Sequence, residues 1–218
     1  MCVSCTSRSR HAPINKRCII MHVIIDYNVG NLASVQQGFL RAGIKTIISQ
    51  DKTKIQAATS LILPGVGAFK ESLDALKASG LIPFIIEHIK QNKPLIGICL
   101  GMQLLYEYSE EYGYHKGLGI FKGTIKRIEG DVKIPHMGWN TLKIETNDPI
   151  VSYLKDKRDV YFVHSYYADS NDGIIATTQY GVTIPAIIKK GNVYATQFHP
   201  EKSGDVGADI LKGYQKIL

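Results

Sequence analysis

Short apolar runs alternate with helix-like segments in the first half of the chain, and this alternation constrains the fold most. The runs predicted as strands are residues 23–26, 44–48, 60–63 and 95–98. The segments predicted as helices are residues 35–42, 69–78, 83–91 and 100–107. Strands that are apolar almost throughout are buried on both faces, so they indicate a parallel sheet covered by helices.

The second half has a different pattern. Residues 119–145 and 160–197 are rich in Val, Ile, Thr and Tyr, with Gly at turns, which predicts antiparallel strands added to the same domain. Residues 204–217 have the pattern of a closing helix. A chain of 218 residues suits one α/β domain, which we place at residues 21–218.

The first 20 residues differ from the rest. They contain four basic residues and no acidic one, and so carry more than half of the net charge of +7. We expect a disordered tail or a non-native start at 1–20, with Met21 as an alternative first residue. The remaining charge is too small to indicate nucleic-acid binding. No apolar run has the roughly 18 residues that a membrane span needs.

Cysteines divide in the same way, because Cys99 is the only one beyond residue 20. An internal disulfide in the folded body is therefore excluded, which fits a reducing cytoplasm. The N-terminal Cys2, Cys5 and Cys18, together with His11, lack a trusted zinc-ligand spacing. We predict neither a metal nor a cofactor.

Cys99 stands in the stretch Gly97-Ile98-Cys99-Leu100-Gly101, between a predicted strand and a predicted helix. A sharp strand-to-helix turn with small neighbours is the geometry of a nucleophile elbow. The helix N-terminus would favour a thiolate, and the Leu100 N–H could receive an oxyanion. Alternatively, the two glycines only let the helix pack closely on the strand. This stretch alone does not decide between the two interpretations.

A thiol nucleophile needs a base and a group that orients the base. The run 193–198 is a predicted strand that ends in His199-Pro200-Glu201. His199 and Glu201 are two residues apart and can project toward the same rim of the sheet. A surface turn is the alternative interpretation, which the presence of a cysteine elbow in the same chain makes weaker.

The loop Leu63-Pro64-Gly65-Val66-Gly67 follows a third predicted strand. Its glycines permit a peptide to turn an N–H toward an anion, although an ordinary tight turn has the same composition. Together these pieces supply a nucleophile, a base with its orienting acid, and two oxyanion donors. All would lie at the carboxyl ends of parallel strands, where α/β sheets place their sites.

These motifs resemble those of class I, triad-type glutamine amidotransferases. The segments DYNVGNL (26–32), PHMGWN (135–140) and FVHSYY (162–167) further resemble the glutaminase subunits of imidazole glycerol phosphate synthases. The resemblance covers about residues 21–218. It implies a flavodoxin-like open sheet, mainly parallel and flanked by helices, with added antiparallel strands.

The resemblance also implies roles. Cys99 would attack the side-chain amide of L-glutamine. His199 would take and return the proton, and Glu201 would orient the His199 ring. The backbone N–H groups of Val66 and Leu100 would stabilise the oxyanion. The residues implied to bind glutamine are Gln103, His164, Ser165 and Tyr166.

The implied partner is a (β/α)8-barrel cyclase subunit, in a heterodimer. It would use the ammonia to convert PRFAR into imidazole glycerol phosphate and AICAR, in histidine biosynthesis. Nucleotide binding at the barrel would raise glutaminase activity. The residues implied at the interface are Met137, Gly138, Trp139, Asn140, Lys202, Asn28 and Asn31. A tryptophan buried in the core is the alternative interpretation of Trp139.

Three other functions remain open. A cysteine hydrolase or DJ-1-like protein also uses a cysteine elbow, but neither would explain PHMGWN. A degenerate amidotransferase could act only as a scaffold for its barrel partner, although all three triad residues are present. The glutaminase subunit of another pathway, such as those for anthranilate or pyridoxal phosphate, would share the triad.

Overall fold

The computed structural model describes residues 20–156 and 158–218. The predicted tail at 1–20 therefore lies outside the described residues, apart from Ile20. The same holds for Cys2, Cys5, His11 and Cys18.

An open sheet of eight strands forms the centre of this described part, in the order β2-β1-β3-β4-β14-β13-β12-β9. The first five strands in that order are parallel, which is the flavodoxin-like arrangement. Their bounds are His22–Ile25 (β1), Thr46–Ser49 (β2), Ser60–Leu63 (β3), Leu95–Ile98 (β4) and Val193–Thr196 (β14). The prediction of a mainly parallel sheet is confirmed.

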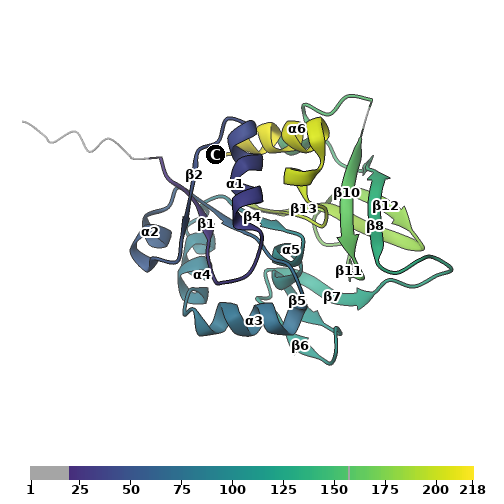
Figure 1. Ribbon diagram of the computed structural model, residues 1–218, viewed down its shortest axis with the longest axis horizontal. Coiled ribbons are helices and arrows are strands. Elements are labelled where there is room, and N and C mark those ends of the chain that lie inside the picture. The colour runs from purple at the N-terminus through teal and green to yellow at the C-terminus, as the bar shows by residue number, and fades with distance from the viewer. Residues whose placement is uncertain (1–19, 157) are drawn as a thin grey trace, which may run out of the picture.

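Helices cover both faces of this sheet (Figure 1). Side chains of α1 and α6 belong to one core, and those of α2, α3 and α4 belong to the other. The bounds are Leu32–Arg41 (α1), Lys52–Ala57 (α2), Phe69–Ala78 (α3), Ile82–Lys90 (α4), Leu100–Leu104 (α5) and Gly204–Gln215 (α6). Two 3₁₀ helices, Pro149–Val151 (η1) and Pro200–Lys202 (η2), pack on α6.

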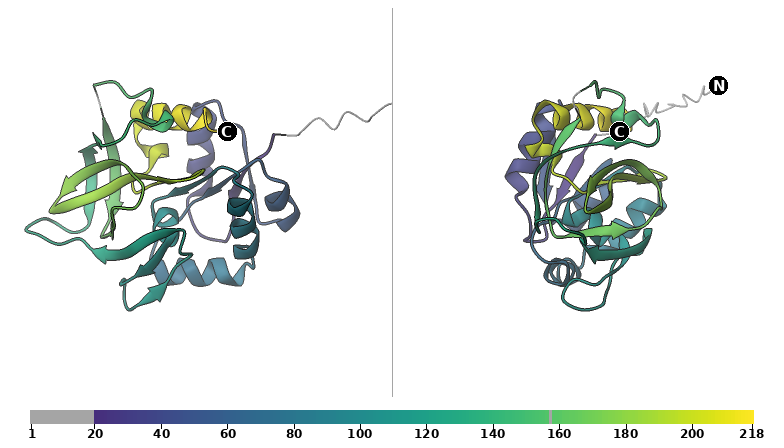
Figure 2. Two further views of the ribbon diagram at one scale, coloured as in Figure 1. Left: turned by 180° about the vertical axis from the view of Figure 1, so that it is seen from behind. Right: turned by 90° about the vertical axis from the view of Figure 1, so that its right-hand side faces the viewer.

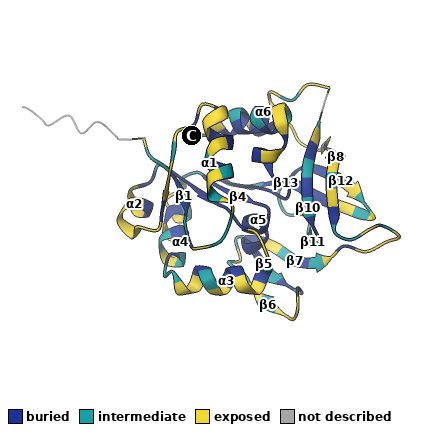
Figure 3. Ribbon diagram, in the orientation of Figure 1, coloured by how far each residue is buried: buried dark blue, intermediate teal, exposed yellow. Residues whose placement is uncertain are grey.

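Alternation along the parallel strands explains their apolar sequences. In β1, Val23 and Ile25 belong to the core under α2, α3 and α4, whereas Ile24 belongs to the core under α1 and α6. In β4, Leu95 and Ile96 divide in the same way. Because successive side chains point to opposite faces, a strand buried on both sides must be apolar at every position. Figure 3 shows β1 and β4 as largely buried, whereas Ile47 and Ile48 of the edge strand β2 are exposed.

The added antiparallel strands occupy the other side of the molecule, as the views in Figure 2 show. Three of them extend the main sheet: Val182–Lys190 (β13), Ile174–Tyr180 (β12) and Lys143–Ile144 (β9). His136–Thr141 (β8) and Asp159–His164 (β10) form a separate antiparallel pair. A third sheet has the order β11-β7-β5-β6, with bounds Tyr166–Asp169, Phe121–Arg127, Tyr106–Ser109 and His115–Lys116. Its β5–β7 pair is parallel, and its other pairs are antiparallel.

Two local predictions were wrong. The helix after Cys99 ends at Leu104 instead of reaching residue 107, because residues Tyr106–Ser109 form strand β5. Tyr106 is fully buried there and pairs with Phe121 of β7, so long-range pairing overrides the helical pattern. Helix α2 was not predicted, although Asp51 caps it by accepting hydrogen bonds from the backbone of Thr53 and Lys54.

Candidate active site

The turn from β4 into α5 places Cys99 in an unusual backbone conformation. Its φ is 54° and its ψ is −111°, and a positive φ is rare for a residue with a side chain. The Cys99 N–H donates to the Thr196 carbonyl of the neighbouring β14 at 2.7 Å. Strain of this kind persists only where surrounding structure fixes it, and it occurs often at reactive residues.

The glycines beside Cys99 are required for packing as well as for the turn. A Cβ on Gly101 would lie 1.9 Å from the Leu63 carbonyl oxygen, and one on Gly97 would lie 2.9 Å from the Gly101 oxygen. Helix α5 therefore lies directly against the backbone of β3 and β4. The close packing of helix on strand is present, and Cys99 lies at the turn between them; its role as a nucleophile stays a prediction.

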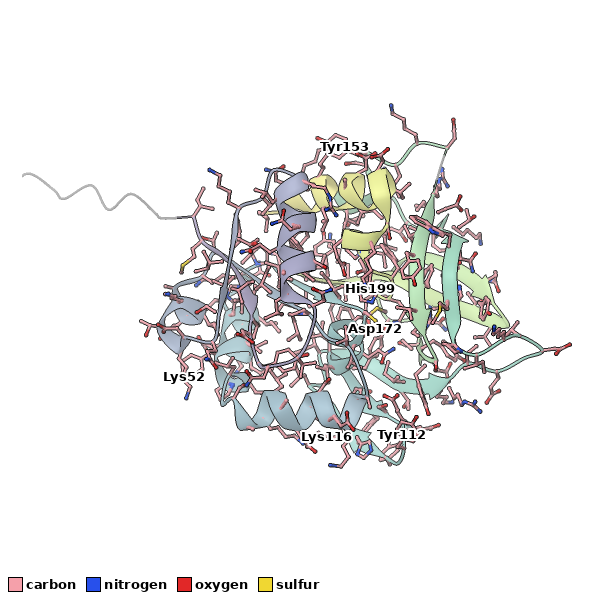
Figure 4. The ribbon with its side chains drawn as sticks, viewed as in Figure 1. Lys52, Tyr112, Lys116, Tyr153, Asp172 and His199 are labelled. Carbon is pink, nitrogen blue, oxygen red and sulfur yellow. The ribbon has the colours of Figure 1, made fainter. Side chains whose placement is uncertain are left out.

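His199 follows β14, the strand next to β4, and lies near the centre of the molecule in Figure 4. Its Nδ1 is 2.8 Å from Glu201 Oε1, and His199 lines the same cavity as Cys99. Burial lowers the pKa of His199, but the interactions with Cys99 and with Glu201 outweigh it and raise this pKa to about 10. The arrangement favours an imidazolium beside the thiol.

Helix α1 packs against Glu201 and holds its backbone. A Cβ on Gly38 would lie 2.5 Å from Glu201 Cβ, so the helix is in contact with that residue. Arg41 Nη2 donates to the Glu201 carbonyl oxygen at 2.6 Å. Neither Gly38 nor Arg41 was predicted, because nothing in their local sequence connects α1 with a residue about 160 positions away.

The two predicted oxyanion donors lie at the same place. Leu100 is the first residue of α5, so its N–H has no partner within the helix. Val66 is 41% exposed, and its carbonyl accepts a hydrogen bond from Ser72 Oγ at 3.2 Å. The buried Tyr27 hydroxyl donates to the Pro64 carbonyl at 2.7 Å and anchors the start of this loop.

A cavity of about 350 Å³ opens beside Cys99, within the size range of small-molecule sites. The predicted residues that line it are Val66, Cys99, Leu100, Gln103, His164, Ser165, Tyr166, His199 and Lys202. Glu201 is not among the lining residues, but it contacts His199, which is. The structure thus brings together the predicted nucleophile, base and pocket.

Glu111 also lines the cavity, although no motif in the sequence marked it as a site residue. It is 9% exposed, and one carboxylate oxygen accepts the Phe69 N–H at 2.6 Å. Burial raises the pKa of Glu111, and the Phe69 hydrogen bond partly opposes this rise. A largely buried carboxylate without a basic partner in the described residues is suited to an ammonium group. In the sequence, Glu111 is one of several acidic residues in loops, and nothing local distinguishes it from the others.

Gln103 contributes a second acceptor to the cavity. Its Nε2 donates to the Tyr166 carbonyl at 2.9 Å and to Gln197 Oε1 at 3.1 Å. Both N–H bonds of the amide are used, so Oε1 is the atom left to accept from a ligand. Gln103 and Glu111 together present oxygen atoms that an amino acid's ammonium group can bind.

The predicted interface residues lie on the surface around β8 and β1. Met137 and Trp139 are 62% and 59% exposed, so Trp139 is not a core tryptophan. Asn31 caps α1 by accepting the Ser34 N–H, and Asn28 is an exposed residue with a φ of 65°. These two asparagines therefore have local structural roles beside any role at an interface.

A family model described as glutamine amidotransferase class-I matches residues 23–213. Two relatives are named imidazole glycerol phosphate synthase subunit HisH. One, from Oceanobacillus iheyensis, is 47% identical over 91% of this chain and all of that protein. The other, from Lactococcus lactis, is 52% identical over 88% of this chain and 96% of that protein. The chain belongs to the class I glutamine amidotransferases, with the HisH subunits.

Solved structures agree on the amidotransferase fold. PurLQS from Thermotoga maritima has a TM-score of 0.71 and 18% identity, and the match covers 90% of this chain and 98% of that one. A structure described as glutamine amidotransferase has a TM-score of 0.68 and 17% identity, covering 89% and 97%. Across the described ranges of this amidotransferase, every helix is too short or too polar to cross a membrane.

Proposed function

We propose that this chain hydrolyses L-glutamine at Cys99, as the glutaminase subunit of an imidazole glycerol phosphate synthase. One observation carries the assignment to Cys99. A cysteine at a positive φ and a histidine that a buried glutamate orients follow neighbouring parallel strands and line one cavity. This is the arrangement that covalent acyl transfer needs.

The geometry supports a two-step reaction. The Cys99 thiolate attacks the side-chain carbonyl carbon of glutamine, and the Val66 and Leu100 N–H groups stabilise the oxyanion. The His199 imidazolium gives its proton to the departing nitrogen, which leaves as ammonia, and a glutamyl thioester remains. Neutral His199 then removes a proton from water, the resulting hydroxide attacks the thioester, and glutamate leaves while the thiolate forms again.

Glutamine fits the cavity by its charges. Its ammonium group would bind the Glu111 carboxylate and Gln103 Oε1. Its carboxylate would lie along the residues 163–166 that line the cavity, with backbone N–H groups of this segment as the proposed donors. Its amide would then point toward Cys99. No step requires a cofactor or a metal.

The proposed partner is a cyclase subunit that uses the ammonia to convert PRFAR into imidazole glycerol phosphate and AICAR. Met137 and Trp139 are exposed at alternate positions of β8, which supports an interface there. Gly138 lies between them in the strand, and Asn140 follows Trp139. Large exposed aromatic and thioether side chains are typical anchors of protein interfaces. Lys202, Asn28 and Asn31 complete the proposed surface.

Coupling to the partner would keep this enzyme from wasting glutamine. We place the switch in the loop 64–67, where the Val66 N–H turns toward the oxyanion only in the activated state. The exposure of Val66 and the positive φ of Gly67 (90°) support a loop that can change the direction of a peptide.

The test is glutamate release by the purified chain alone, with the cyclase subunit, and with that subunit plus PRFAR. Weak activity that rises strongly only with both additions, and that disappears in Cys99→Ala, would support every part of the proposal. Full activity without a partner would support the glutaminase and contradict the coupling. A folded chain that is inactive in all three conditions would favour a scaffold.

A further inference from the structure

Two buried histidines link the exposed strand β8 with the glutamine cavity. Asn140 Nδ2 lies 3.3 Å from His136 Nε2, and His136 Nδ1 lies 3.1 Å from His164 Nε2. His164 Nδ1 then lies 2.9 Å from the Tyr166 carbonyl oxygen. We refer to these four groups (Asn140, His136, His164 and the Tyr166 carbonyl) as the histidine relay.

Hydrogen-bond chemistry fixes the direction of the relay. A carbonyl only accepts, so His164 Nδ1 carries the proton, and neutral His164 must then accept at Nε2. His136 Nδ1 is the donor to that nitrogen, which leaves His136 Nε2 to accept from Asn140. Each ring therefore has one donor and one acceptor, and each contact is satisfied only when both histidines are neutral. Burial favours this state, because it lowers the pKa of His136 to about 4 and that of His164 to about 3.

The relay ends on the carbonyl that orients Gln103. Tyr166 O accepts from His164 Nδ1 and also from Gln103 Nε2 at 2.9 Å, which uses both of its lone pairs. The other Gln103 N–H is held by Gln197 Oε1 at 3.1 Å. If the Tyr166 carbonyl moved, the Gln103 amide would lose one of the two contacts that keep its oxygen directed at the ligand. A rotated amide would present N–H groups to a cationic ammonium, which repel it.

We propose that His136 is a positioning residue for glutamine, acting through His164 and the Tyr166 carbonyl on the orientation of Gln103. His136 itself does not line the cavity and does not touch the reacting atoms. This role of His136 rests on the proposed function, since that function makes Gln103 a ligand of the glutamine ammonium group.

Packing around His136 supplies the means to test this role separately from stability. Its ring stacks on Tyr180 at a centroid distance of 3.9 Å and on Phe162 at 4.7 Å. A phenyl ring at this position keeps the stacking and removes both hydrogen bonds. Asparagine does the reverse, because its amide nitrogen lies near the position of Nδ1 and can still donate to His164.

The experiment measures glutamine affinity in a Cys99→Ala background by calorimetry, and the glutamine KM and kcat in the active complex. We expect H136F to weaken binding and raise KM about tenfold or more, with kcat changed less than threefold. H136N should recover most of the affinity despite a lower melting temperature. Tyr180→Phe, which keeps the stacked ring and lies outside the relay, should match the parent.

The outcomes separate the two proposals. If the Cys99→Ala chain does not bind glutamine and the parent complex releases no glutamate, the proposed function is wrong. If the parent is active and H136F binds glutamine as tightly as the parent, only the role of His136 is overturned. It is also overturned if H136N binds no better than H136F, since the retained donor would then have no effect.

Discussion

Gly38→Ala is the substitution that best tests how this enzyme orients its triad, because it adds one methyl group on α1, far from Cys99 in the sequence. The new Cβ would lie 2.5 Å from Glu201 Cβ, whereas Cβ contacts rarely fall below 3.4 Å. Helix and glutamate must therefore separate by about 0.9 Å, the difference between those two distances. If this shift falls on the His199–Glu201 contact of 2.8 Å, that contact becomes too long for a hydrogen bond.

A displacement of this size in a catalytic group reduces rates by up to about 100-fold, so we expect kcat to fall roughly 10- to 100-fold. The free energy of unfolding should change by a smaller factor than kcat. Overpacking costs about 1–3 kcal/mol, and alanine gains about 1 kcal/mol over glycine in a helix. A net loss of about 1 kcal/mol lowers the melting temperature of a chain this long by roughly 2–4 °C.

Two rates measure the effect well below the melting temperature. One is glutamate release at saturating glutamine in the complex, and the other is alkylation of Cys99 by a chloroketone analogue of glutamine. Gly213→Ala is the matched control, because its Cβ would lie 2.3 Å from the Ile150 oxygen, away from the triad. If Gly38→Ala kept the parent kcat, or if Gly213→Ala lost as much, α1 would not orient Glu201.

Other predictions address the oxyanion donor, the elbow and the charge of His199. Val66→Pro removes one donor N–H, and we expect a loss of at least tenfold in nucleotide-stimulated activity; a folded variant with parental stimulated activity would contradict the loop proposal. Gly101→Ala should not fold stably, because its Cβ would overlap the Leu63 oxygen at 1.9 Å; a parental melting temperature would show that α5 can move away. Because the folded pKa of His199 is about 10 and its unfolded value about 6.5, its stabilisation is complete below pH 6.5 and is lost as pH rises toward 10. A His199→Gln variant should lose that part of the pH dependence of thermal unfolding, and an unchanged dependence would refute the assignment.

Much of the sheet could be predicted from the sequence, because burial on both faces leaves a local signal. The strands Ser60–Leu63 and Leu95–Ile98 and the helix Phe69–Ala78 have the predicted bounds. The boundary of α5 could not be predicted, since Tyr106 has a helical neighbourhood in sequence and a strand partner in space. The flavodoxin-like topology was implied by the family resemblance and not by periodicity, and the structure supplies the strand order.

The candidate site likewise contains residues that a local sequence pattern predicts and residues that only long-range contacts place. Cys99 and His199 could be selected because each ends an apolar strand, and strand ends of a parallel sheet share one edge. Glu111 lies in a loop, and its place beside the cavity depends on the contact with Phe69, which is distant in sequence. His136 was noticed only as part of the motif PHMGWN. Its role depends on pairing between β8 and β10, which places it opposite His164.

Packing and reactivity at Cys99 have a common structural origin. Gly65 and Gly101 let the loop after β3, the start of α5 and the backbone of β3 approach within distances that no Cβ allows. Cys99 lies at this turn with a φ of 54°, and its N–H is held by the Thr196 carbonyl. The same approach brings loop 64–67 to the N-terminus of α5, where both proposed oxyanion donors meet. A larger side chain at either glycine would therefore push these segments apart, so we expect it to reduce stability and to separate the proposed oxyanion donors at the same time.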